Sequence, residues 1–387
     1  MIHLRHHAGD LAGLCLVWLV QALAVWFALR TPAVAGRPSL RRLTWVIAAA
    51  CATVSFLAVA LALGPVERNA PEWVTTWGRG AMMAGAFLSV FAAIAIILGR
   101  ALPHGRPEYS AARRNFLRAA NVALLGAPAA AVGYGMFVER TRIRLREEEI
   151  KIPGLHPDLD GLRIVQLTDI HMSPFLTERE LNRAIGIANE TRANLALVTG
   201  DFITGSADPL DLCLTRLAGL RSDAGIFGCL GNHEIYAQVE DYTEREAASL
   251  GIRLLRNQAV PLQFGKATMN LAGVDYQHFQ EPYLVGADRM VLLDALNVML
   301  SHNPDVFPVA AAQGWDLTIS GHTHGGQVRV EILHQDLNVA RFFTPYVDGI
   351  YQNGPASIFV SRGIGTIGLP ARLGAPPEVA LLRLCRI

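Results

Sequence analysis

Charged residues are scarce in this 387-residue sequence, where they make up 17% of the chain. A soluble globular domain usually carries about 25%. The deficit falls on residues 1–138, which contain almost no acidic side chains. The formal net charge is +1, so nothing in the charge balance points to nucleic acid or another polyanion as a partner. The chain therefore divides into an apolar N-terminal part and a C-terminal part of ordinary charge.

Paired cysteines are also missing. The five cysteines show no CxxC and no paired spacing. Cys15 and Cys51 lie in apolar runs, where a free cysteine behaves as a small hydrophobe. These absences exclude a disulfide framework and a zinc site built from thiolates.

Four apolar stretches in the N-terminal part reach the length of a bilayer crossing, which takes about 20 residues. They are residues 11–29, 43–63, 81–98 and 119–138. We therefore predict a bundle of about four transmembrane helices over residues 1–138. A linker over 139–160 and a soluble domain over 161–387 would follow.

The arginines between these stretches predict which side of the membrane each loop faces. Four lie between Arg30 and Arg42 and five between Arg100 and Arg118, in the first and third loops. The positive-inside rule places both loops in the cytoplasm. The prediction is a multi-pass protein of the bacterial inner membrane with its soluble domain on the periplasmic side. The basic residues from Arg140 to Lys151 argue for the opposite side.

The pair Arg113-Arg114, followed by an Ala/Gly-rich run, has two interpretations. It resembles a twin-arginine export signal, in which case the export machinery is a partner. An arginine pair before any span also satisfies the positive-inside rule without export. Both interpretations stay open.

The C-terminal part alternates between short apolar runs and helical segments. Five runs predict strands, and each one leads into residues that can bind a metal: 162–168, 195–199, 226–230, 296–301 and 316–320. A helix is expected over 177–190, where Thr177 and Glu180 form a capping box. Because sites in layered α/β proteins assemble where strand ends converge, these residues are expected to meet.

The residues at the strand ends form one set of candidate metal ligands: Asp169, His171, Asp201, Asn232, His302, His322 and His324. Mixed nitrogen and oxygen ligands without thiolate suit Mn, Fe or Zn. Seven ligands exceed the needs of one tetrahedral ion. They suit two divalent ions that share a carboxylate.

The order Asp-x-His, Gly-Asp, Gly-Asn-His-Glu, a lone His and Gly-His-x-His resembles that of the calcineurin-like metallophosphoesterases, over residues 162–384. The C-terminal stretches Ser361–Thr366, Pro370–Arg372 and Pro376–Glu378 together resemble a membrane-associated bacterial branch of that superfamily. The resemblance implies a four-layer α/β sandwich, in which two mixed β-sheets are flanked by helices. It also implies a phosphoester hydrolase.

The resemblance further implies a role for each residue. Asp169, His171 and His324 would hold one ion. Asn232, His302 and His322 would hold the other, and Asp201 would bridge the two. A metal-bridging hydroxide would attack phosphorus, while His233 beside the phosphate would stabilise the transition state or protonate the leaving oxygen. The catalytic residues expected are therefore His233 and Asp201.

Several alternatives stay open. A membrane anchor favours a lipid-linked or envelope-related phosphoester, and membrane lipid, as partners. One rival is a catalytically inactive membrane receptor or scaffold. Another is a UDP-2,3-diacylglucosamine hydrolase at the cytoplasmic face, which the outward orientation disfavours. Glu234 either orients a histidine or begins a surface helix. Arg362 or Arg372 either binds a substrate phosphate or lies in an ordinary surface loop.

Overall fold

The computed structural model describes residues 2–30, 32–62, a few positions between 80 and 128, and then 130–277, 282–332 and 335–387. The chain divides into two compact units. One comprises residues 1–134 with 368–370, and the other comprises 135–367 with 371–387.

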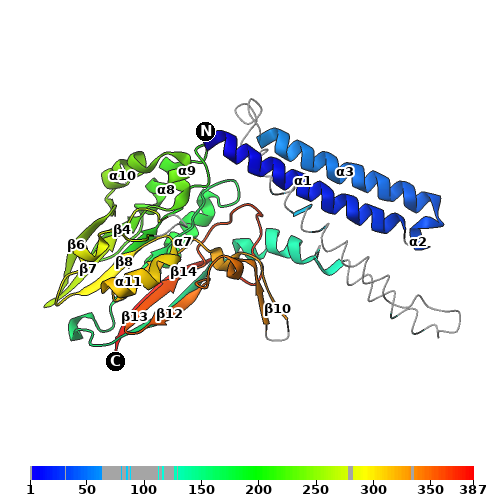
Figure 1. Cartoon of the computed structure of the whole chain (residues 1–387). Coiled ribbons are helices and arrows are strands. Elements are labelled where there is room, and N and C mark those ends of the chain that lie inside the picture. The colour runs from blue at the N-terminus through cyan, green and yellow to red at the C-terminus, as the bar shows by residue number, and fades with distance from the viewer. Residues whose placement is uncertain are drawn as a thin grey trace. The chain divides into compact units, whose positions relative to one another are not determined.

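The first unit contains two long helices, α1 (Ile2–Leu29) and α3 (Pro38–Ala62), joined through α2 (Pro32–Ala35). Helices α1 and α3 lie side by side (Figure 1). Trp18 and Phe56 stack between them, with ring centroids 6.4 Å apart. Large apolar side chains on both helices are exposed, among them Leu19 at 57% and Ile47 at 53%.

Among the residues that the structure describes, no helix combines the length and the hydropathy that a membrane crossing needs. The predicted bundle of four transmembrane helices is therefore not supported. Most of the third predicted span, the start of the fourth and the pair Arg113-Arg114 lie outside the described residues. The described residues of the fourth predicted span, 126–128 and 130–137, are helical.

The second unit is built on two six-stranded sheets (Figure 1). The strands of the first sheet, in spatial order, are β1 (Arg144–Ile152), β14 (Glu378–Arg386), β2 (Arg163–Leu167), β3 (Leu195–Thr199), β4 (Ile226–Cys229) and β5 (Ile252–Leu254). The strands of the second sheet are β12 (Gly349–Asn353), β13 (Ala356–Val360), β9 (Leu317–Ser320), β8 (Leu296–Leu300), β7 (Ala267–Gly273) and β6 (Gln258–Phe264). Both sheets are mixed, because β14 is antiparallel to β2, and β6 and β12 are antiparallel to their neighbours. A separate hairpin pairs β10 (Arg329–Ile332) with β11 (Gln335–Asn338).

Apolar side chains hold the layers together. One cluster joins the facing sides of the two sheets and includes Leu197 of β3 and Val298 of β8. The other face of the first sheet packs against α7 (Glu178–Glu190), α8 (Leu210–Leu217) and α10 (Glu240–Ser249). The other face of the second sheet packs against α11 (Phe307–Gln313). Two mixed sheets flanked by helices are the fold class expected from the sequence.

The five predicted strands are present as β2, β3, β4, β8 and β9. The predicted helix is α7, and its capping box is formed by Thr177 and Glu180. The segment 139–160, expected to be a linker, contains strand β1 at the edge of the first sheet. Its sequence reads as polar because an edge strand exposes many side chains, but Ile150 and Ile152 are buried.

Candidate metal centre

All seven candidate ligands follow the carboxyl ends of strands. Asp169 and His171 follow β2, Asp201 follows β3, and Asn232 begins α9 (Asn232–Ala237) after β4. His302 follows β8 of the second sheet, whereas His322 and His324 follow β9. Strands β2, β3 and β4 run parallel, as do β8 and β9, so their carboxyl ends share an edge in each sheet. The two sheets therefore bring these loops together.

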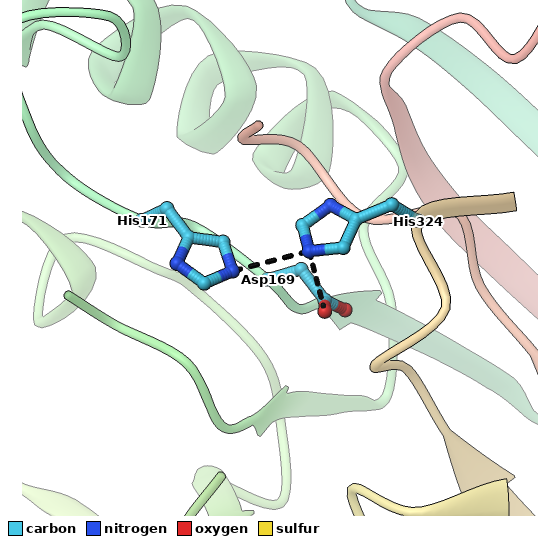
Figure 2. A group of neighbouring side chains, drawn as sticks. All are labelled: Asp169, His171 and His324. Carbon is cyan, nitrogen blue, oxygen red and sulfur yellow. Dashed lines mark hydrogen bonds and ion pairs between the residues drawn. The ribbon is translucent and has the colours of Figure 1, made fainter. Parts of the chain in front are cut away.

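Asp169, His171 and His324 form a first group, and their side chains point toward one another (Figure 2). The Nε2 atoms of the two histidines lie 3.1 Å apart. His324 Nε2 lies 3.4 Å from Asp169 Oδ1. All three side chains are buried.

Asp201, His302 and His322 form a second group. Asp201 Oδ2 lies 3.0 Å from His302 Nε2 and 3.5 Å from His171 Nε2. The carboxylate of Asp201 thus touches a histidine of each group.

Asn232 and His233 complete the arrangement. Asn232 is buried, and within the described part of the chain its side-chain oxygen has no hydrogen-bond partner. The backbone N–H of His233 donates to Asp201 Oδ1 at 3.0 Å. Its ring meets that of His171 edge-on, with centroids 4.8 Å apart.

Two histidine rings are oriented by backbone carbonyls. His302 Nδ1 lies 2.7 Å from the carbonyl oxygen of Thr199, and His233 Nδ1 lies 2.8 Å from that of Thr204. Since a carbonyl only accepts, each Nδ1 carries the proton in these contacts and each Nε2 is left as the possible ligand or acceptor. Metal-binding histidines are commonly fixed in this way.

The backbone at the site is strained. Five of the seven candidate ligands have positive φ angles: Asp169 (51°), His171 (47°), Asp201 (54°), His322 (74°) and His324 (53°). For residues with a β-carbon this left-handed region is uncommon, and such strain gathers at functional sites.

Burial keeps three imidazoles neutral, which is the form that binds metal. It lowers the pKa of His171 and that of His322 to about 3. It also lowers the pKa of His324 well below the ordinary value, with further contributions from His171 and Arg372.

Asp201 and His302 form an ion pair in which Nε2 of His302 also carries a proton, and a metal ion bound at this nitrogen would replace that proton. Burial is the largest single effect and acts against both charges, but the attractions from the neighbouring groups together outweigh it. The pKa of Asp201 is held well below its ordinary value, chiefly by His302. The pKa of His302 rises to about 10 beside Asp201. Burial raises the pKa of Asp169 to about 6.

The spacing of the side chains fits a metal ion. Ligand atoms about 2.1 Å from one ion lie roughly 3.0–3.4 Å apart in octahedral or tetrahedral geometry. The distance between Nε2 of His171 and Nε2 of His324 falls in this range, as does that between His324 Nε2 and Asp169 Oδ1. The distances from Asp201 Oδ2 to Nε2 of His302 and of His171 fall in or near it. A cation would also satisfy the buried oxygen of Asn232. The donor set therefore fits divalent metal.

Glu234 is not on the surface. It is fully buried, and its carboxylate accepts from the backbone N–H groups of Asp201, Phe202 and Gly231. In the sequence, the position of Glu234 in the motif Gly-Asn-His-Glu is the feature that marks it as a candidate supporting residue. The carbonyl of Thr204 accepts from His233, and its hydroxyl contacts His171. Thr204 belongs to no motif, so sequence reasoning missed it.

The two C-terminal arginines contact protein groups. Arg362 pairs with Asp348 at 2.7 Å. Arg372 is fully buried and donates to backbone carbonyls, so its guanidinium is not available to a substrate phosphate. The expectation that Arg372 lies in a surface loop is wrong.

The chain is thus a layered α/β protein with buried carboxylates and imidazoles at its strand ends, where they form a candidate metal centre. The Calcineurin-like phosphoesterase family profile matches residues 162–326. An Aquifex aeolicus protein named as a metallophosphoesterase is 30% identical over 232 residues, covering 58% of this chain and 85% of that protein.

Two further relatives match similarly. Phosphodiesterase YaeI of Escherichia coli is 28% identical over 286 residues, covering 70% of this chain and 98% of that protein. A Danio rerio protein named "Transmembrane protein with metallophosphoesterase domain" is 28% identical over 297 residues, covering 73% of this chain and 66% of that protein. The chain belongs to the calcineurin-like metallophosphoesterase family, and its homologues point to a phosphoester hydrolase.

Proposed function

We propose that the protein hydrolyses a phosphodiester with two divalent metal ions. Asp169, His171 and His324 would hold one ion. Asn232, His302 and His322 would hold the other. The observation that carries the proposal is the position of Asp201, whose Oδ2 lies 3.5 Å from His171 Nε2 and 3.0 Å from His302 Nε2. A carboxylate in that position can bridge two ions.

The metals, when bound, supply Lewis-acid stabilisation of phosphate charge and activation of the attacking water. The chain's own residues do the rest. Glu234 fixes the backbone of Asp201. His233 Nδ1 donates to the carbonyl of Thr204, so its Nε2 can take up a second proton, and the ring in that protonated form would give it to the leaving oxygen. Burial of the ligands excludes bulk water from the inner side of the site.

The phosphodiester class is supported by the name of the Escherichia coli relative. The test is turnover of bis-p-nitrophenyl phosphate by the full chain in detergent, after metal removal and addition of Mn²⁺, Fe²⁺ or Zn²⁺. We expect metal-dependent turnover. Failure with all three ions, in protein shown to be folded, would favour the inactive receptor or scaffold.

A lipid-linked substrate is supported by an apolar loop near the site. Phe342 and Phe343 are 86% and 76% exposed. The loop is held at one end by Asn338, which donates to the carbonyl of Gly325 beside His324. It is held at the other end by Thr344, which donates to Asp305 three residues after His302. Two exposed aromatic rings between these anchors suit contact with acyl chains.

Association with a membrane is supported by the exposed apolar side chains of α1 and α3 and by the name of the Danio rerio relative. The side of the membrane and export by the twin-arginine machinery stay predictions. Alkaline phosphatase fused after Arg146 tests the side: an active fusion agrees with a periplasmic catalytic domain. An expressed but inactive fusion would place that domain in the cytoplasm.

A further inference from the structure

The C-terminal segment from Ser361 to Glu378 lies outside the residues matched by the family profile. It contains Arg372, whose side chain is fully buried. A buried cation is costly unless its hydrogen bonds are met and its charge is compensated. Its contacts therefore indicate what it does.

The guanidinium of Arg372 is surrounded by main-chain oxygens. It donates to the carbonyls of Gly365, His324, Ala375, Arg362 and Gly363. Within the described residues none of its hydrogen bonds goes to a carboxylate. Although burial lowers the pKa of Arg372 to about 10, the side chain is charged at neutral pH. The charge is solvated by two loops rather than paired with one acid.

One of these loops, residues 362–365, lies against Asp169. The N–H of Ile364 donates to the carbonyl of Thr168 at 3.1 Å, and that of Gly365 donates to the carbonyl of Asp169 at 2.6 Å. A β-carbon on Gly363 would lie 2.5 Å from that of Asp169. The backbone of the first ligand is therefore packed directly on this loop.

The other loop carries His324. Arg372 Nη1 donates to the carbonyl of His324 at 2.8 Å, and Nη2 lies 3.2 Å from its ring Nδ1. The opposite ring nitrogen, Nε2, faces His171 and Asp169 (Figure 2). The guanidinium thus contacts both the main chain and the ring of His324, which has a strained φ of 53°.

We propose that Arg372 is a positioning residue of the metal centre, whose guanidinium cross-links the loops carrying Asp169 and His324 and sets the distance between these two ligands. The inference rests on the proposed metal site. The planar fork of arginine, with five N–H donors, can serve both loops at once. Lysine keeps the charge but has three donors on one atom, so it cannot reproduce these contacts.

The test compares the full chain with Arg372→Lys and, as a matched control, Arg256→Lys. Arg256 also makes several hydrogen bonds, but to Asp275, Asp241 and Glu244 rather than to the ligand loops. After metal removal, each protein is titrated with Mn²⁺ and its bound manganese is counted. We expect two ions in the wild type and in Arg256→Lys. We expect Arg372→Lys to bind one of them about 10- to 100-fold more weakly.

Turnover of bis-p-nitrophenyl phosphate provides a second measurement on Arg372→Lys. At high Mn²⁺, turnover by Arg372→Lys should recover most of its loss, which a general folding defect would not allow. Wild-type affinity for both ions in Arg372→Lys would overturn the proposal. A wild type that binds no manganese would instead overturn the proposed function.

If Arg372→Lys does not fold, hydrogen exchange on the wild type tests the same coupling. Amides of residues 361–367 should become more protected when Mn²⁺ binds, because the ligands and this loop are cross-linked. The hairpin of β6 and β7 serves as the reference and should not change. Equal protection of residues 361–367 with and without Mn²⁺ would overturn the proposal.

Discussion

The carboxylate of Glu234 accepts a hydrogen bond from the backbone N–H of Asp201, with Oε2 3.0 Å from the nitrogen. The same oxygen accepts from the N–H of Gly231 at 2.8 Å. A single buried side chain therefore joins the loop after β3 to the loop after β4. The position of the proposed bridging carboxylate depends on a residue that would not itself touch metal.

Glu234→Gln tests this support. The amide keeps one oxygen and replaces the other with a donor, which would face backbone N–H groups. We expect a loss of about 2 kcal/mol in stability and weaker metal binding. The measurements are thermal unfolding and manganese affinity. Glu178→Gln, which removes a surface ion pair with Arg216, is the control and should cost well under ~1 kcal/mol. Equal effects would contradict the role of Glu234.

Gly231→Ala tests the tight approach of the same two loops. A β-carbon there would lie 2.1 Å from Asp201 Oδ1 and 2.6 Å from its backbone nitrogen. We expect displacement of the carboxylate, a stability loss of about 1–3 kcal/mol and loss of turnover. Gly186→Ala in α7, with no atom within 4 Å of its β-carbon, is the control and should slightly stabilise the protein. Wild-type turnover by Gly231→Ala would contradict the close packing of Gly231 against Asp201.

His233→Gln separates proton transfer from metal binding. His233 is not among the proposed ligands, so manganese content should stay at the wild-type level. Loss of the acid should lower kcat about a hundred- to thousand-fold. Loss of bound manganese in this variant would show that His233 is a ligand, contrary to the account.

The double variant Phe342→Ser with Phe343→Ser tests the lipid-linked substrate. Turnover of the water-soluble bis-p-nitrophenyl phosphate should be unchanged. Hydrolysis of a phospholipid phosphoester in vesicles should fall about tenfold or more, because burial of even one of the two phenylalanine rings is worth about 1.5–3 kcal/mol. Leu293→Ser, at a residue 92% exposed and away from the site, is the control. Equal rates on vesicles before and after the substitution would remove the support for a lipid substrate.

The sequence predicted the strands that carry the site because their signals are local. Leu195–Thr199 is a continuous apolar run, and Asp201 follows it directly. Strand β1 was missed because its Arg/Glu-rich sequence forms a strand only by pairing with β14, far along the chain. The contacts of Arg372 were missed for the same reason. They join residues 48 positions apart, and no local pattern encodes them.

The sequence alone allows Glu234 either to begin a surface helix or to orient a histidine. Its true partners are the N–H groups of the neighbouring loop, which sequence spacing does not show. The membrane bundle was predicted from hydropathy alone, and the described residues do not support it.

The central claim is that one carboxylate, Asp201, joins two metal ions. The most direct test is to count the manganese bound by metal-stripped wild type and by Asp201→Asn across a Mn²⁺ titration. The account predicts two ions in the wild type, weakened binding of both in the variant, and near-complete loss of turnover. Two ions bound with unchanged affinity by Asp201→Asn would contradict it.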